Sequence, residues 1–273
     1  LVAPAAFKLL GNLEKILGFF RRLGVLSFHP VLPYADITLW AYFTLLRETG
    51  GLFFFSACVG LNRCLREIEG QHCLAPEYSP LLCTARYLGT YRRLEGDFAF
   101  LSPCRLKEKE FVTLEGENLV RYNITIRELD DFINKGDINL SPCPAVKPED
   151  DDFCPGLTLA SSGSVGGVLG ALLPERKFVV KQGLAETVSW LRDKDSRSNS
   201  VLDGYACPGG CLYGSGTGWK SKDASPAGTE YAETGGEQTA TRQTAEHTEA
   251  VRRLFARYTQ ELRVADFCHT QDL

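Results

Sequence analysis

The chain has 273 residues, of which 44% are hydrophobic and 23% charged, a composition typical of a folded protein with room for one large domain or two ordinary ones. Its formal net charge is −4 and its pI is about 5.7. A general nucleic-acid-binding protein needs a basic surface to displace counterions from phosphates, so we expect no nucleic-acid partner. The chain lacks Met and begins at Leu1, which we interpret as the start of a processed or trimmed product.

Residues 1 to 30 are predicted to form a basic amphipathic helix. Apolar side chains fall on one helical arc, and Lys8, Lys15 and Arg22 follow at seven-residue spacing on the other side. Such a helix can lie in a membrane interface, and these three cations are then the candidate contacts with an anionic surface. It can also pack on its own domain with the basic face in water, an arrangement that is common in soluble proteins and that we favour.

Residues 31 to 194 form the predicted main domain, which starts with the most apolar part of the chain. The apolar runs 37–46 and 52–61 are separated by a charged, glycine-containing break. Each run is shorter than the roughly twenty apolar residues that cross a bilayer. We therefore expect buried helices or strands here, and no transmembrane span.

The pattern between residues 108 and 126 changes to a period of two, which predicts a central β-hairpin that turns at 115–118. A short helix from about Arg127 to Asn134 is expected after it. The acidic run 149–152 lacks the alternating ligands and the glycine turn of a calcium loop, so we interpret it as a solvated loop.

A glycine-rich turn and a short helix lie between two apolar runs in residues 157 to 181, which predicts a short βαβ-like unit. The stretch resembles the first strand, turn and helix of the Rossmann fold, with Gly163 and Gly166 matching the second and third glycines of the phosphate-binding turn. Ala160 stands where the first glycine would be. The resemblance implies a nucleotide or dinucleotide on the turn at 160–168, and the candidate binding residues are Gly163, Gly166, Gly167 and Lys181.

No catalytic constellation is recognised elsewhere. The same glycines resemble a protein-kinase loop, but no H-R-D or D-F-G element follows Lys181, which excludes a working kinase. The four histidines form no helix pair and accompany no strand-turn-helix serine. We therefore predict no catalytic residue.

Ten cysteines stand at positions 58, 64, 73, 83, 104, 143, 154, 207, 211 and 268. An even number spread along a chain is typical of disulfides made in an oxidising compartment, outside the cell or in an organelle lumen. The Pro-Gly-Gly turn between Cys207 and Cys211 makes this pair the candidate disulfide. Structural zinc sites repeat a close ligand pair, which this spacing does not do, so we expect no metal and no cofactor. Buried thiols are the alternative.

The last part of the chain divides into two predicted segments. Residues 195 to 241 are rich in Gly, Ser and Thr and are predicted to be irregular. Residues 242 to 273 are predicted to carry a C-terminal amphipathic helix that docks on the protein's own domain or on a partner.

The sequence as a whole predicts an α+β fold: an N-terminal helical and apolar region, a central hairpin, a short βαβ-like unit and a C-terminal helix. We interpret the chain as a non-catalytic, cysteine-rich binding or accessory protein that acts through contacts with a protein partner and that can associate with a membrane surface. The alternative is a nucleotide- or dinucleotide-binding enzyme that uses the glycine turn.

Overall fold

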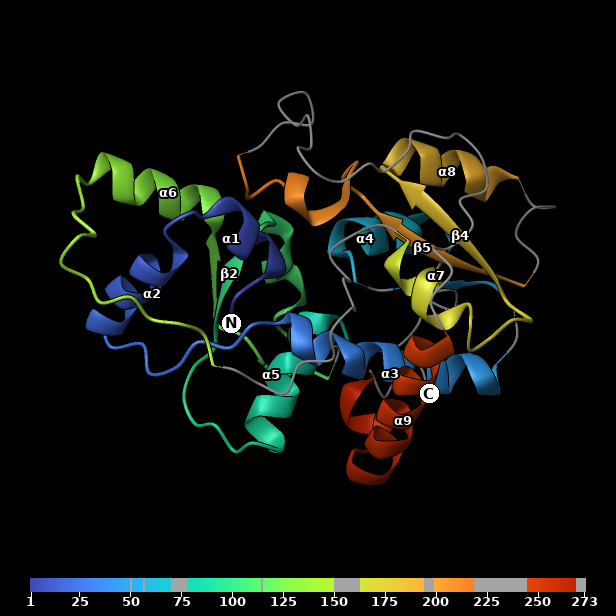
Figure 1. Ribbon diagram of the computed structural model, residues 1–273. Helices are drawn as coiled ribbons and strands as arrows, with labels where there is room; N and C mark the ends of the chain where they lie inside the picture. Colours follow the sequence, from blue (N-terminus) through green and yellow to red (C-terminus); the bar gives the residue numbers. More distant parts are fainter. Residues whose placement is uncertain are drawn as a thin grey trace.

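The computed structural model has the α+β fold that the sequence predicted. It describes residues 1–49, 51–55, 57–69, 78–113, 115–149, 163–193, 199–218 and 245–268. Figure 1 shows two lobes, each containing a small sheet, with helices α3 (Ala35–Glu48) and α9 (Ala245–Glu261) below them in this view.

The larger sheet is parallel, and β5 (Ser200–Tyr205) lies between β1 (Phe53–Phe54) and β4 (Lys177–Gln182). Helix α8 (Leu184–Arg192) joins β4 to β5, so the βαβ unit comes one element later than predicted. The predicted strand before the glycine turn lies outside the described residues. All of β5 is buried, as expected for a strand covered on both faces. Because its neighbours run parallel to it, the segments after β1 and β5 emerge at the same edge.

The smaller sheet pairs β2 (Ala99–Ser102) with β3 (Tyr122–Thr125), again in parallel. The predicted hairpin is reduced to a tight turn with a single antiparallel bridge between Val112 and Asn118. Two features explain the difference. Residues Arg105–Glu110 form the 3-10 helix η3, which leaves the first arm short, and β2 offers β3 an apolar, largely buried partner.

Helix α6 (Ile126–Lys135) follows β3 directly and confirms the helix predicted there. Its first turn is held by a capping box, because the Thr125 hydroxyl accepts from the Glu128 amide and the Glu128 carboxylate accepts from the Thr125 amide. The remaining elements are α4 (Val59–Glu69), α5 (Pro80–Thr90), α7 (Ser164–Leu169) and the 3-10 helices η1 (Leu32–Tyr34), η5 (Gly210–Tyr213) and η6 (Val264–Phe267).

The N-terminal segment forms two helices, α1 (Pro4–Leu9) and α2 (Leu13–Arg22). The apolar side of α2 packs with Ile126 and Leu129 of α6 in one buried cluster. Lys15 does not face a free surface, because its ammonium donates to the Cys143 carbonyl at 2.7 Å. The interpretation of this segment as membrane-associated is therefore wrong: the apolar face that would enter the interface is buried inside the protein.

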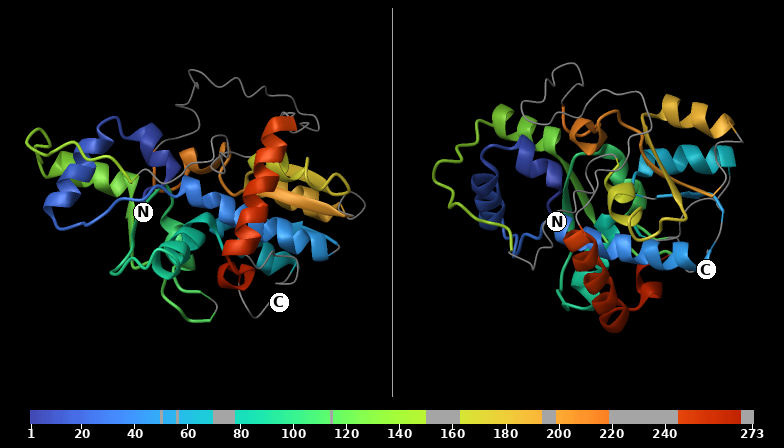
Figure 2. Two further views of the ribbon diagram at one scale, coloured as in Figure 1. Left: turned by 60° about the horizontal axis from the view of Figure 1, so that its bottom comes forward. Right: turned by 45° about the vertical axis from the view of Figure 1, so that its right-hand side comes forward.

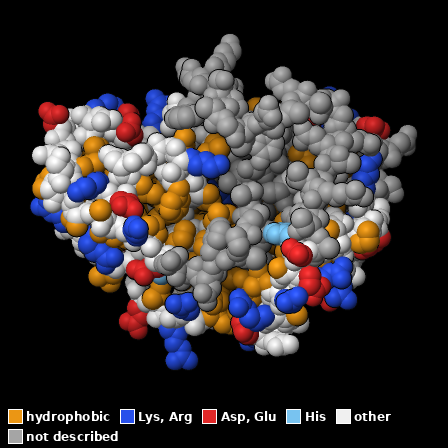
Figure 3. All heavy atoms as spheres, viewed as in Figure 1, with side chains coloured by type: hydrophobic (Ala, Val, Ile, Leu, Met, Phe, Trp, Pro, Cys, Tyr) orange, Lys and Arg blue, Asp and Glu red, His pale blue; other side chains and the backbone are white. Residues whose placement is uncertain are grey.

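One face of the molecule shows mixed charge among the described residues. On the face in Figure 3, Lys and Arg side chains are interspersed with Asp and Glu side chains. Within the described residues, no helix combines the length and the apolar character needed to span a bilayer. Contact of the exposed Lys8 and Arg22 with an anionic surface stays a prediction, as does the absence of a nucleic-acid partner.

Helix α3 is the central helix of the core, and its buried side chains face both lobes. It packs against both α5 and α9, and Figure 2 shows the red helix α9 against it. Trp40 fixes this contact, because its indole N–H donates to the Thr259 hydroxyl at 3.0 Å. The C-terminal helix thus packs on its own chain, which was the favoured interpretation.

The domain boundary predicted at residue 195 falls inside the larger sheet. Strand β5 belongs to the predicted irregular segment 195–241, yet it is the central strand. Asp203 and Gly204 hid its strand character, since both residue types are rare in strands. Residues 219–244 lie outside the described part of the chain.

A buried carboxyl stands in the first turn of α3. Asp36 is 2% exposed, and its Oδ1 has no hydrogen-bond partner among the described residues. Burial raises the pKa of this carboxyl from 3.8 to about 8, so the folded protein holds it protonated at neutral pH. The unfolded chain releases that proton near pH 4.

This difference makes stability depend on pH. Because the folded-state pKa lies above the unfolded one, the stabilising contribution of Asp36 is complete below pH 4 and is lost as the pH rises through about 8. We expect Asp36→Asn, a neutral substitute of the same shape, to flatten the fall in unfolding free energy by about 1 kcal/mol per pH unit between roughly pH 5 and pH 7.5. Urea denaturation of both proteins measures this, and parallel curves would contradict it.

Candidate functional site

Four cysteines follow the carboxyl ends of three parallel strands. Cys58 comes after β1 and directly precedes α4, and Cys104 comes after β2 and directly precedes η3. Cys207 and Cys211 follow β5, the second of them inside η5. The crevice outside the carboxyl ends of parallel strands is where α/β proteins usually place a site.

Hydrogen bonds to sulfur join these segments. The amide of Ala206, beside Cys207, donates to the sulfur of Cys58 at 3.4 Å, which connects the segments after β5 and β1. The Ser215 hydroxyl donates to the sulfur of Cys104 at 3.9 Å, and the Arg105 amide donates to the same hydroxyl at 3.2 Å. The two sheets are thus bonded together at their cysteines.

The four thiols also act on one another electrostatically. Burial raises the pKa of Cys211 to about 12, and Cys58, Cys104 and Cys207 raise it as well, while Lys107 lowers it. Burial, Cys58 and Cys104 also raise the pKa of Cys207. Cys207 and Cys211 are therefore poor nucleophiles in the bare protein, because their thiols stay protonated. A bound metal centre removes the protons and takes up the negative charge.

Two glycines bring the segment after β5 close to the smaller sheet. A Cβ on Gly214 would stand 2.3 Å from the Pro103 carbonyl oxygen, and one on Gly216 would stand 3.0 Å from the Cys104 amide nitrogen. The Gly216 amide donates to the Pro103 carbonyl at 2.9 Å, and the Gly216 carbonyl accepts from Arg127 at 2.8 Å. Only a residue without a side chain allows the backbones to approach so closely.

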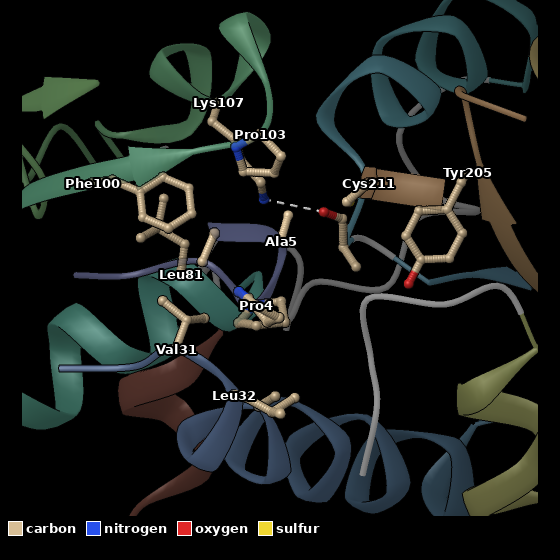
Figure 4. Close-up of a pocket in the computed structure, with 14 residues that line it drawn as sticks. Pro4, Ala5, Val31, Leu32, Leu81, Phe100, Pro103, Lys107, Tyr205 and Cys211 are labelled. Atoms are coloured by element: carbon tan, nitrogen blue, oxygen red, sulfur yellow. Dashed lines mark hydrogen bonds between the residues drawn. The ribbon is translucent and has the colours of Figure 1, made fainter. Parts of the chain in front are cut away.

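A cavity of about 70 Å³ adjoins Cys211. Figure 4 shows it between α1, α3, α5 and the segment after β2, with Lys107 reaching in beside Pro103. Its lining is almost entirely apolar and comprises Ala3, Pro4, Ala5, Val31, Leu32, Ala35, Ala57, Pro80, Leu81, Phe100, Pro103, Lys107, Tyr205 and Cys211. Lys107 is the one charged residue among these.

The ammonium of Lys107 is held by two acceptors. It donates to the Glu110 carboxylate at 2.6 Å and to the Ala57 carbonyl at 3.1 Å. Burial lowers its pKa, but Glu110 and the thiols of Cys211 and Cys58 outweigh burial and raise the pKa above its ordinary value. The cavity therefore has a permanent positive charge at its wall.

The donor set fits a cluster better than a single ion. Among the described residues, no three His, Cys, Asp or Glu side chains are close enough together to hold one metal ion, which rules out a compact zinc site there. Cubane iron–sulfur clusters are held by four cysteine thiolates. Such a cluster gives each thiolate an iron atom of its own, so the sulfurs stand further apart than around one ion.

The disulfide prediction is wrong for the described cysteines. No disulfide joins any of the eight that the structure describes, and Cys207 and Cys211 are both thiols. The Pro-Gly-Gly turn does bring them to one place, but as two members of a group of four. Cys73 and Cys154 lie outside the described residues, and the oxidising compartment stays a prediction.

The glycine turn lies where it was expected, but its amides are occupied. Gly163 has a positive φ of 86° and precedes α7. The carboxylate of Asp203 on β5 accepts from the amides of Val165 and Gly166 at 3.0 and 3.3 Å, and Lys181 pairs with Glu186 at 3.2 Å. Gly167 lies within α7. The donors of the turn thus bond to the protein itself, and dinucleotide binding stays a prediction.

The sequence does contain a signal for the missed residues Cys58 and Cys104. Each of the two directly follows a mainly apolar run, at 52–57 and 98–103, and Cys207 follows the segment 201–206, in which Asp203 and Gly204 interrupt the apolar residues. An apolar run that ends in a cysteine is what a buried strand carrying a site residue at its carboxyl end looks like. Spacing along the chain between the cysteines gave no such indication.

Comparisons with known proteins identify a family and a fold. Residues 4–177 match the family model described as iron only hydrogenase large subunit, C-terminal domain. An apo form of the [FeFe]-hydrogenase HydA1 from Chlamydomonas reinhardtii superimposes with a TM-score of 0.66 at 16% identity, over 98% of this chain and 92% of that one. No curated protein matches the sequence.

Two further solved structures have the same fold at 16% identity, with the same coverage. One reports that oxygen inactivation of [FeFe]-hydrogenase begins at the 2Fe subcluster of the H cluster, with a TM-score of 0.64. The other reveals stepwise H-cluster assembly in HydA(deltaEFG), with a TM-score of 0.63. The prediction of a non-catalytic accessory protein is therefore wrong, because the matched family is that of the large subunit of a metalloenzyme.

The glycine contact between the two sheets can be tested directly. Gly214→Ala places a methyl group against the backbone of Pro103, so we expect it to lower the unfolding free energy by about 1–3 kcal/mol. Gly11→Ala is the matched control, because a Cβ there meets nothing within 4 Å; it should change stability by less than about 0.5 kcal/mol. Equal stability of the two variants in urea would show that the contact is not tight.

Proposed function

Because this chain belongs to the iron-only hydrogenase family, matching the C-terminal domain of its large subunit, we propose that it is an iron–sulfur enzyme that interconverts dihydrogen with two protons and two electrons. The observation that carries the proposal is the meeting of four thiols beside an apolar cavity that contains one buried ammonium. The family indicates the class of reaction, and these residues indicate where in the chain the cofactor would bind.

Cys58, Cys104, Cys207 and Cys211 are the proposed ligands of a four-iron, four-sulfur cluster. They supply four thiolates from three segments, which is the number such a cluster requires. Their arrangement also explains why single-ion sites are absent from the described residues. Hydrogen bonds from the Ala206 amide and the Ser215 hydroxyl to two of the sulfurs then tune the potential of the bound cluster.

The cavity beside Cys211 is the proposed place for a second, diiron part of the cofactor, by analogy with the 2Fe subcluster named for the relative. When bound, this metal centre supplies the redox chemistry on dihydrogen. The chain contributes an apolar wall, which keeps bulk water out and admits a small apolar gas. Lys107 contributes a fixed positive charge, which favours a negatively charged occupant.

The cluster ligands are tested by replacing each cysteine singly with serine. After anaerobic reconstitution with iron and sulfide, we expect Cys58→Ser, Cys104→Ser, Cys207→Ser and Cys211→Ser each to lose cluster affinity by more than the roughly 10–100-fold caused by removing an outer-shell partner. Cys64→Ser is the matched control, because Cys64 lies within α4 and is none of the four proposed ligands.

Iron and acid-labile sulfide per chain, together with the visible absorption of the cluster, report the outcome. Full cluster content in any two of the four variants would contradict the proposed ligand set. Loss of the cluster in Cys64→Ser as well would point to general unfolding, which circular dichroism of the apo proteins detects.

A further inference from the structure

A second cavity lies between α3, α9 and the segment that joins α7 to β4, and we call it the α3–α9 cavity. Its volume is about 490 Å³, which falls in the range of small-molecule sites. Ala35, which begins α3, lines the cavity near Cys211. Arg47, which lines the α3–α9 cavity, stands in the last turn of the same helix, roughly 18 Å along its axis. The two cavities are therefore separate.

The floor of the α3–α9 cavity is apolar. Phe255 and Leu173 are each 3% exposed, and the half-buried Phe43 and Leu172 also line it. The ring centroids of Phe43 and Phe255 are 5.3 Å apart, with an angle of 43° between the planes. An aromatic ring that packs against such a pair gains ring–ring contact in addition to the burial of its apolar surface. The floor thus favours a flat aromatic group.

Three charged side chains line the same cavity, those of Arg47, Arg252 and Glu175. All three residues are exposed, so their charges stand at the rim of the cavity. The guanidinium of Arg47 is oriented by the floor, because its central carbon lies 5.6 Å from the centroid of the Phe43 ring. A guanidinium held over a ring still has N–H donors in its own plane, and these can bind an anion.

The guanidiniums of Arg47 and Arg252 are not used within the protein as far as the structure describes it. Neither one forms an ion pair or donates a hydrogen bond to a described residue. The two other arginines of α9 each pair with a glutamate one turn away, Arg253 with Glu249 and Arg257 with Glu261. Arg252 therefore differs from its neighbours on the same helix: its donors stay available to a ligand.

The other polar groups of the lining contribute less to anion binding. The Thr259 hydroxyl accepts from the Trp40 indole at 3.0 Å and donates to the Phe255 carbonyl at 2.9 Å, so it is already used. The Glu175 carboxylate repels an anion. With two guanidiniums and one carboxylate, the lining keeps a positive charge, which favours a negatively charged ligand.

We propose that the α3–α9 cavity binds a small aromatic anion, that is, a flat ring that carries a carboxylate or a phosphate. The ring lies against Phe43 and Phe255, and the anionic group accepts hydrogen bonds from Arg47 and Arg252. Arginine suits both groups, because its planar fork matches paired carboxylate or phosphate oxygens. The site is distinct from the four cysteines, and the inference does not depend on the proposed function.

The test titrates the full chain with four compounds in a calorimeter. 2-Naphthoate and 2-naphthyl phosphate carry both halves of the proposed ligand and distinguish a carboxylate from a phosphate. 2-Naphthamide retains the ring without the charge, and inorganic phosphate retains the charge without the ring. The variants are Arg47→Met, Arg252→Met and Glu175→Gln. Arg253→Met is the matched control from α9, because Arg253 is paired with Glu249.

We expect at least one of the two aromatic anions to bind more tightly than either half alone, by about 10-fold or more. The loss of one charge-assisted hydrogen bond predicts that Arg47→Met and Arg252→Met each weaken the anion by about 10-fold while leaving 2-naphthamide unchanged. Glu175→Gln should strengthen anion binding, because it removes a like charge from the rim. Arg253→Met should behave as the unmodified chain.

Three results would overturn the inference: no binding of either aromatic anion at millimolar concentration, equal binding of 2-naphthamide and the anions, or unchanged anion binding in both Arg47→Met and Arg252→Met. An equal loss in Arg253→Met would also overturn it, because general surface charge would then hold the anion. The substituted side chains are exposed, so the core stays intact, and circular dichroism of each variant checks this.

Discussion

Four thiols gather at the junction of two small parallel sheets, and hydrogen bonds to two of their sulfurs join the segments that carry them. Burial and mutual repulsion raise the pKa values of Cys207 and Cys211, so the bare site resists forming thiolates. A metal cluster reverses that balance, because coordination to iron stabilises the thiolate. The fold thus brings together four cysteine side chains whose thiolate forms are stabilised only when a cofactor is bound.

Close backbone contacts, rather than side-chain packing, hold the segments of this junction together. Gly214 and Gly216 let the segment after β5 lie against the residues around Cys104, and the hydrogen bonds of Gly216 join that segment to Pro103 and Arg127. The buried carboxylate of Asp203 fastens β5 to the start of α7. On the other side, Lys107, paired with Glu110, is the one charged residue in the otherwise apolar cavity wall.

Sequence reasoning recovered what local patterns determine. The α+β class, the helix after Thr125 and the C-terminal helix were predicted because helical periodicity and capping are local properties. The parallel pairing of β2 with β3 was missed, since pairing between distant segments leaves no local periodicity and the alternation at 108–126 favoured a hairpin. Strand β5 was missed because Asp and Gly, which stand at positions 203 and 204, are both rare in strands. In the structure, the Asp203 carboxylate accepts from the amides at the start of α7.

Half of the proposed ligand set was recognised from the sequence. Cys207 and Cys211 were recognised as a pair, but Cys58 and Cys104 join them only through the topology of two separate sheets. A disulfide was the simpler interpretation for a pair on a tight turn, and pairwise spacing cannot reveal a set of four ligands drawn from three strands. The positions of Cys58 and Cys104 directly after mainly apolar runs were the physical clue, and they pointed to strand ends rather than to cross-links.

The central claim, that four thiolates from the ends of three strands hold one iron–sulfur cluster, is tested most directly by iron X-ray absorption on the anaerobically reconstituted chain. The account predicts iron surrounded by sulfur alone, with neighbouring iron atoms at cluster distances and one protein thiolate for each iron. Iron bound through nitrogen or oxygen, or isolated iron without iron neighbours, would contradict it.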